Sequence, residues 1–187
     1  MNAGAPHKNL RALSEIFFNS EAELGRFESV EAAALPGHYR RLLDHQEHMT
    51  VAVEAYHESL VDVDVLASQS TETHYARRIL LRRRDTGEVV QWGLMRIHLP
   101  SFAEEVRREI AEEQRPLGRI LVRHNFLRTI HVDALWRIEP GPELCQQFDL
   151  AGGSNAETPP TTYGRTADIH INGQSAVEVL EVVAPLR

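Results

Sequence analysis

The chain has 187 residues, of which 42% are hydrophobic and 25% are charged, as in an ordinary soluble protein with a sizeable core. Its 27 acidic and 20 basic residues give a net charge of −7. This balance argues against a protein whose surface as a whole binds nucleic acid or an anionic membrane. It leaves open a small anionic ligand, because the few groups that line a pocket set the field inside it.

The length of the apolar stretches and the number of cysteines further limit the class of protein. The longest apolar runs fall far short of the roughly 20 residues that span a bilayer, and the first residues lack the apolar core of a secretory signal. We therefore expect a cytoplasmic protein without a membrane segment. A single cysteine, Cys145, excludes an internal disulfide and a cysteine-rich zinc site. We expect residues 1–187 to form one domain.

The N-terminal third has the apolar spacing of helices. Residues 8–58 carry apolar side chains at helical intervals, with a break at Pro36-Gly37. From Ser59 the period changes, because three valines in residues 61–65 alternate with two aspartates. That alternation predicts a strand with one solvent-facing side.

A hairpin and a helical segment are predicted next. Strands over residues 73–84 and 88–99 meet at the turn Asp85-Thr86-Gly87. Ser101 is the expected cap of a helix that runs to about Glu113. After the interruption at Pro116-Leu117-Gly118, residues 119–123 are expected to continue as a short helix.

The C-terminal third returns to strands. We expect a strand over residues 125–138, a long loop over residues 139–162, and two strands that flank Asn172-Gly173, which is a strong hairpin signal. This order predicts an α+β fold. Its centre is a twisted antiparallel sheet of about six strands, with N-terminal helices and one inserted helix.

The last predicted strand contains a carboxylate in an apolar row. Strand periodicity places Glu181 with Val177, Val179 and Val183. A carboxyl group that is buried in such a row can exchange protons near neutral pH. The alternative is a strand end at which Glu181 simply reaches solvent.

Two arginines lie in similar rows. Arg77 shares its row with Tyr75, Ile79 and Leu81, and Arg96 shares its row with Trp92 and Leu94. A guanidinium on an apolar sheet face needs a carboxylate, either Glu181 or that of a ligand. Each arginine taken singly could instead extend along the surface into solvent.

Metal binding has weak support. His45 and His48 are three residues apart and could share a helix face, but no further ligands stand at the usual spacing. We therefore expect no metal.

An ordered series of short motifs resembles the chorismate lyase family, also called chorismate-pyruvate lyase or 4-hydroxybenzoate synthase, over roughly residues 37–187. The motifs are Tyr75-x-Arg77-x-Ile79-Leu80-Leu81, Gly87, Arg96 with Pro100, Pro116-Leu117-Gly118-Arg119, Arg128, Tyr163-Gly164-Arg165 and Leu180-Glu181-x-x-x-Pro185. Residues 1–34 have no counterpart and are expected to be a helical extension.

The resemblance implies that the chain removes the enolpyruvyl group of chorismate as pyruvate, leaves 4-hydroxybenzoate, and uses neither metal nor cofactor. By the same resemblance, Glu181 is the catalytic glutamate and Arg77 clamps a substrate carboxylate. Substrate contacts are further implied for four residues, namely Met49, Leu117 with its backbone N–H, Gly118 and Arg96. Met95 departs from one branch of the family, which has glycine there.

A sensor domain of the same fold, which binds a small carboxylate without turnover, is the alternative, together with a related lyase that acts on another cyclohexadiene acid. DNA binding by the N-terminal segment is disfavoured, because residues 1–58 hold five basic residues against nine acidic ones.

Overall fold

The computed structural model of the protein describes residues 4–150 and 159–186. These residues form an α+β fold around one seven-stranded sheet with the order β1-β5-β6-β7-β4-β3-β2. Every neighbouring pair of strands is antiparallel. The predicted fold class is confirmed.

The strands are β1 (Gly25–Val30), β2 (Val61–Ser70), β3 (His74–Arg83), β4 (Val89–His98), β5 (Arg128–Pro140), β6 (Thr162–Ile171) and β7 (Gln174–Val183). The helices are α1 (Gly4–Ser14), α2 (Gly37–Leu43), α3 (Met49–His57), α4 (Glu104–Ala111), α5 (Leu117–Arg123) and α6 (Pro142–Gln147).

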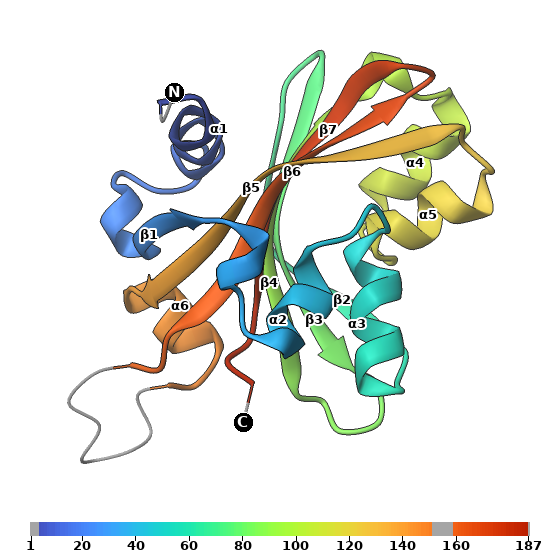
Figure 1. Cartoon of the computed structure of the whole chain (residues 1–187). Helices are drawn as coiled ribbons and strands as arrows, with labels where there is room; N and C mark the ends of the chain where they lie inside the picture. Colours follow the sequence, from blue (N-terminus) through green and yellow to red (C-terminus); the bar gives the residue numbers. More distant parts are fainter. Residues whose placement is uncertain (1–3, 151–158, 187) are drawn as a thin grey trace.

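The helices pack on both faces of the sheet (Figure 1). Helices α2 to α5 cover one face, whose core includes Leu43, Val53, Val106 and Ile120. Helices α1 and α6 pack on the other face, whose core is built around Trp92 and Trp136 and similar large side chains. The α2–α5 face is the one that carries Met49 and Leu117.

Strand β7 shows how the alternation of side chains serves both cores. Leu180 and Val182 belong to the core under α1, whereas Val179 and Val183 belong to the core under α2–α5. Glu181 lies between Leu180 and Val182 and therefore faces the same side as Val179 and Val183. The sequence-based row of Glu181 is thus correct.

The expectation that residues 8–58 are helical is wrong for residues 25–30, which form strand β1. This segment pairs with β5 in a register that runs from Gly25 opposite Pro140 to Val30 opposite Leu135. Only Phe27 is buried in it, so the segment lacks the apolar pattern of a strand. A partner more than a hundred residues away determines its conformation.

Two local details also differ from expectation. The helix after Pro100 begins at Glu104 and has Ala103 at its N-cap, because Ser101 lies in a 3-10 turn and its Oγ contacts His98 Nδ1 at 2.9 Å. The expected loop over residues 139–162 contains helix α6. Residues 151–158 of that loop lie outside the described part of the chain.

The final hairpin forms as predicted. Asn172 and Gly173 link β6 to β7 with φ values of 50° and 81°. Positive φ at both central residues is the conformation of the tight turn that Asn-Gly favours. A register shift between Ile169 and His170 separates this turn from the pairing of Arg165 with Glu181.

Candidate functional site

A small cavity lies between the α2–α5 face of the sheet and the N-terminal ends of α3 and α5. Its volume is about 30 Å³, close to the space that one water molecule takes in the liquid. The lining residues that bear on function are His48, Met49, Gln91, Leu117, Gly118 and Glu181. The structure thus brings four of the six predicted site residues to one place.

The floor of this region is a patch of three neighbouring strands. Its cross-strand rows are Arg77–Met95–Val179, Ile79–Gly93–Glu181 and Leu81–Gln91–Val183. The middle row has no side chain at Gly93. The sheet surface is therefore lowest at its centre, between Ile79 and Glu181.

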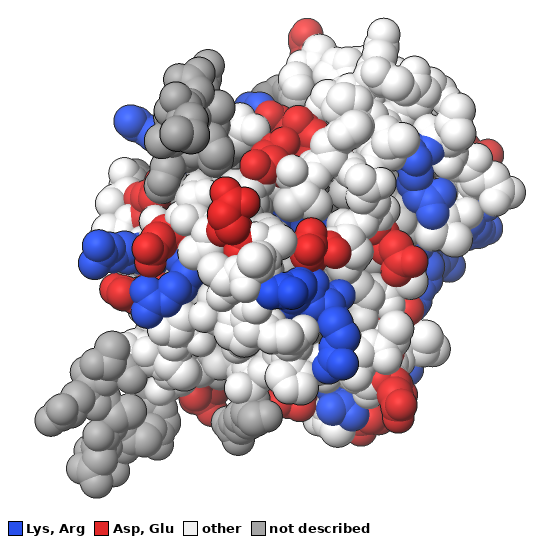
Figure 2. Space-filling model, viewed as in Figure 1, with Lys and Arg blue, Asp and Glu red and all other residues white. Residues whose placement is uncertain are grey.

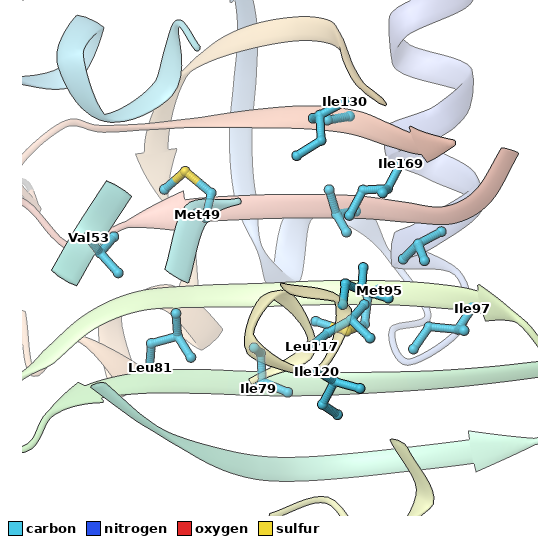
Figure 3. Close-up of a cluster of buried hydrophobic side chains, with 14 of the residues drawn as sticks. Met49, Val53, Ile79, Leu81, Met95, Ile97, Leu117, Ile120, Ile130 and Ile169 are labelled. Carbon is cyan, nitrogen blue, oxygen red and sulfur yellow. The ribbon is translucent and has the colours of Figure 1, made fainter. Parts of the chain in front are cut away.

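The roof comes from the first turns of two helices. His48 is the N-cap of α3 and is followed by Met49 and Thr50, while Leu117 and Gly118 open α5. A Cβ atom at Gly118 would stand 2.9 Å from His48 Cβ, so glycine permits the close approach of these helices. Figure 3 shows Met49, Met95 and Leu117 around this part of the core.

Arg77 is a buried cation that forms no salt bridge, although Tyr75 and the more distant Glu113 carboxylate stabilise its charge. Arg77 is 0% exposed, and its Nε donates a hydrogen bond to Met95 Sδ at 3.3 Å. One Nη2 contact reaches the Arg115 carbonyl at 3.4 Å, and Nη1 has no hydrogen-bond partner. No Asp or Glu of residues 4–150 and 159–186 forms a salt bridge with it. Burial lowers the pKa of Arg77 because charge is costly away from water.

Glu181 pairs with a different arginine. Arg165 Nε donates to Glu181 Oε2 at 2.8 Å, and the Glu181 side chain is 14% exposed. Arg165 is 1% exposed and also donates to the carbonyls of Leu43, His45 and Glu47. The pair therefore links Glu181 to the segment that leads into α3.

The role of Arg165 was missed by the sequence reasoning, although it stands in the motif Tyr163-Gly164-Arg165. Its row contains Ala167 and Ile169, both buried under α2–α5. The same row argument that singled out Arg77 and Arg96 would have found it.

Arg77 on β3 and Glu181 on β7 lie on the same face, in adjacent rows, with only strand β4 between them. With usual sheet spacings, their Cα atoms are about 12 Å apart. They do not touch each other. Two side chains of this length can instead reach opposite sides of one small ring.

Two more polar atoms in the cavity wall are unpaired. His48 Nε2 and Gln91 Oε1 are buried and have no hydrogen-bond partner. Burial, with a smaller contribution from Arg128 and Arg165, lowers the pKa of His48 to about 4. The imidazole is therefore neutral at pH 7. Buried polar atoms usually have partners, so such atoms in a cavity wall favour a polar ligand.

Arg96 is not part of this cavity. Its row partners Trp92 and Leu94 belong to the core under α1, on the opposite face from Met95. Its Nε donates to Glu178 Oε2 at 2.5 Å, and both side chains are about one third exposed. The structure thus places Arg96 in a partly exposed salt bridge on the α1 side of the sheet.

The histidines of the α2–α3 region serve local structure. His45 Nε2 lies 2.7 Å from the Leu42 carbonyl, whereas His48 occupies the N-cap position of α3 without a capping bond from its side chain. In the part of the chain that the structure describes, no group of three His, Cys, Asp or Glu side chains could hold a metal ion.

Figure 2 shows acidic and basic side chains side by side on the face in view. Exposed ion pairs join Arg82 to Asp64 and Arg84 to Asp62 beside β2 and β3. None of the described helices is long and apolar enough to cross a membrane.

No family model matches the chain, and no curated protein matches it. Among solved structures it is similar to a possible transcriptional regulator, YydK, from Bacillus subtilis subsp. subtilis str. 168, with a TM-score of 0.45 and 10% sequence identity. The match covers 66% of this chain and 57% of the regulator, so the chain spans less than two thirds of that protein.

Proposed function

We propose that the cavity binds a cyclic carboxylate and that the protein is a cofactor-independent lyase that converts chorismate to 4-hydroxybenzoate and pyruvate. One observation carries this proposal. Arg77 does not line the cavity itself, but it is fully buried behind Met95, which does. It forms no salt bridge with a described acidic residue, and its Nη1 has no hydrogen-bond partner. A ligand carboxylate would supply the missing charge and accept a hydrogen bond from Nη1.

The proposed reaction needs positioning and proton transfer only. The bond between a ring carbon and the enolpyruvyl oxygen breaks, and the neighbouring ring carbon that bears the hydroxyl loses its proton. The departing enolpyruvyl oxygen takes up a proton, and the enol so formed tautomerises to pyruvate. Because the ring becomes aromatic, holding the substrate in a reactive conformation supplies much of the rate.

Glu181 is the proposed proton carrier. It lines the cavity, and in this proposal it accepts the ring proton and returns it to the enolpyruvyl oxygen. Arg165 holds the carboxylate in position through the same Nε contact. Arg77 fixes the ring carboxylate on the other side of Gly93.

The cavity has to enlarge before a ring can enter, because about 30 Å³ is far below the volume of such a ligand. The side chains in the way are flexible. Met49 and Met95 both line the cavity, and methionine can change rotamer at low cost. Met95 already contacts Arg77 Nε, which is where the ligand carboxylate would bind.

A sensor that binds the carboxylate without turnover is the second candidate. The Glu181–Arg165 pair favours it, since a carboxylate that is tied to a buried arginine can serve structure alone. In that case the ligand would bind and leave unchanged.

Incubation of the purified protein with chorismate, with pyruvate and 4-hydroxybenzoate measured separately, tests the enzyme proposal. We expect both products in equal amounts and well above the uncatalysed background. Binding of 4-hydroxybenzoate without product release from chorismate would favour the sensor.

Glu181→Gln should lower turnover by about 100-fold or more and retain product binding, because it removes the proton acceptor and keeps the shape. Glu178→Gln is the matched control, since Glu178 lies on the same strand but faces the other side. Equal turnover in the two variants would remove Glu181 from the mechanism.

A further inference from the structure

The unpaired polar atoms of the cavity point to a second recognition element. We infer that His48 and Gln91 form a subsite that binds a hydroxyl group on the ligand ring, at the end opposite the carboxylate that Arg77 holds. This inference rests on the proposed function and specifies the ligand class, namely ring carboxylates with a hydroxyl para to the carboxylate.

Both side chains are built into the wall of the cavity. His48 is 5% exposed and Gln91 is 3% exposed, and both line the cavity. His48 Nε2 and Gln91 Oε1 have no hydrogen-bond partner. Leaving a buried polar atom without a partner is unfavourable, so a ligand hydroxyl that bonds to these atoms would gain affinity.

The positions along the sheet fit a ligand of one ring. Arg77 lies opposite Met95, and Gln91 lies four residues from Met95 on the same strand. The Cα atoms of Arg77 and Gln91 are therefore about 14 Å apart by usual strand spacings. Gln91 Nε2 stands 3.7 Å from the place where a Cβ at Gly93 would be, so its amide reaches back over the empty centre of the floor.

The chemistry of the two groups selects a hydroxyl. A neutral imidazole and an amide can each donate and accept a hydrogen bond, as a hydroxyl does. His48 is neutral at pH 7 because burial lowers its pKa to about 4. A second carboxylate at this end would lie near Glu181, which also lines the cavity, and the nearby Arg165 is already paired with Glu181. The subsite therefore disfavours dicarboxylates that bear a carboxylate in the para position.

The test compares the dissociation constants of 4-hydroxybenzoate and benzoate for the wild-type protein by calorimetric titration. We expect 4-hydroxybenzoate to bind about ten-fold more tightly or better, which is the effect of roughly one good hydrogen bond. Equal affinity for the two ligands would overturn the hydroxyl subsite and leave the carboxylate site standing. Absence of binding by both would overturn the proposed function and the subsite with it.

Variants assign the effect to its residues. Gln91→Leu and His48→Phe should each reduce the preference for the hydroxyl to about two-fold or less and change benzoate affinity little, since benzoate does not use these atoms. Gln174→Leu, at an exposed glutamine in the final hairpin, should keep the wild-type preference. An undiminished preference in both cavity variants would contradict the assignment.

Discussion

Two buried arginines flank the candidate site in different environments. Arg77 and Arg165 are 0% and 1% exposed. Arg165 has a carboxylate and several backbone carbonyls as partners. Arg77 has a sulfur atom, one long contact to a carbonyl, and an unpaired Nη1. We interpret Arg165 as a structural cation and Arg77 as a ligand-binding cation.

This difference predicts opposite effects on stability. Arg77→Met should leave the free energy of unfolding unchanged or raise it by about 1 to 3 kcal/mol, because it removes a buried charge that forms no salt bridge. Arg165→Met should lower the free energy of unfolding by about 3 to 5 kcal/mol, because it leaves the largely buried Glu181 without its paired cation. Urea denaturation of the ligand-free proteins measures both. A loss for Arg77→Met as large as that for Arg165→Met would contradict the assignment.

His48 predicts a pH dependence of stability. Its pKa is about 4 in the folded protein and near 6.5 in the unfolded chain, so the unfolded chain takes up the proton first as the pH falls. The free energy of unfolding should therefore fall between pH 6.5 and 4, by up to about 1.4 kcal/mol per pH unit.

Denaturation of His48→Gln across the same pH range isolates this effect, because glutamine does not titrate. The variant should lose much of the slope. Part will remain, because burial also lowers the pKa values of His45 and His57. Identical slopes in the variant and the wild type would show that His48 does not titrate in this way.

The elements that the sequence predicted correctly have local signals. The β3–β4 and β6–β7 hairpins follow from alternation and turn residues, and the Asn172-Gly173 turn has the φ values that its composition favours. Strand β1 has no such signal. It forms at the sheet edge because β5 offers it a partner, and this pairing is tertiary information.

The same division holds for the site. The alternation of side chains along a strand predicts which neighbours share a face with Arg77 and with Glu181. The structure places both residues on the face under α2–α5. Arg96 also shares a face with Trp92 and Leu94, as predicted. The alternation of side chains along a strand, however, does not tell which face of the sheet carries the cavity. The unpaired atoms of His48 and Gln91 become visible only once the fold has excluded every partner.

At the level of elements, the contact between α3 and α5 depends on Gly118. A Cβ there would meet His48 Cβ at 2.9 Å and Thr50 Oγ1 at 3.1 Å, so the helices would have to separate. Gly118→Ala should lower the free energy of unfolding by about 1 to 3 kcal/mol and weaken ligand binding.

Gly37→Ala is the matched control, since Gly37 also begins a short helix after a proline and a Cβ there meets nothing within 4 Å. It should be neutral or slightly stabilising. Chemical denaturation of both variants gives the comparison, and equal effects would refute the close-contact explanation.

At the scale of the whole molecule, the two faces of the sheet carry different kinds of side chains. The α1 face holds large aromatic side chains such as Trp92 and Trp136, both 0% exposed. The α2–α5 face combines an apolar core with the buried arginines and the cavity. Because β1 pairs directly with β5 in this sheet, we propose that residues 1–187 form a single domain.

The most direct measurement is a calorimetric titration of 4-hydroxybenzoate into the wild-type protein, Arg77→Met and Arg78→Met. Arg78 is the control because it lies on the other face, over the ring of Phe18. We expect Arg77→Met to lose about 100-fold or more in affinity, as a buried carboxylate loses its paired cation, and Arg78→Met to bind like the wild type. If Arg77→Met binds 4-hydroxybenzoate as tightly as the wild type, the claim that this buried guanidinium binds the ligand's carboxylate is contradicted.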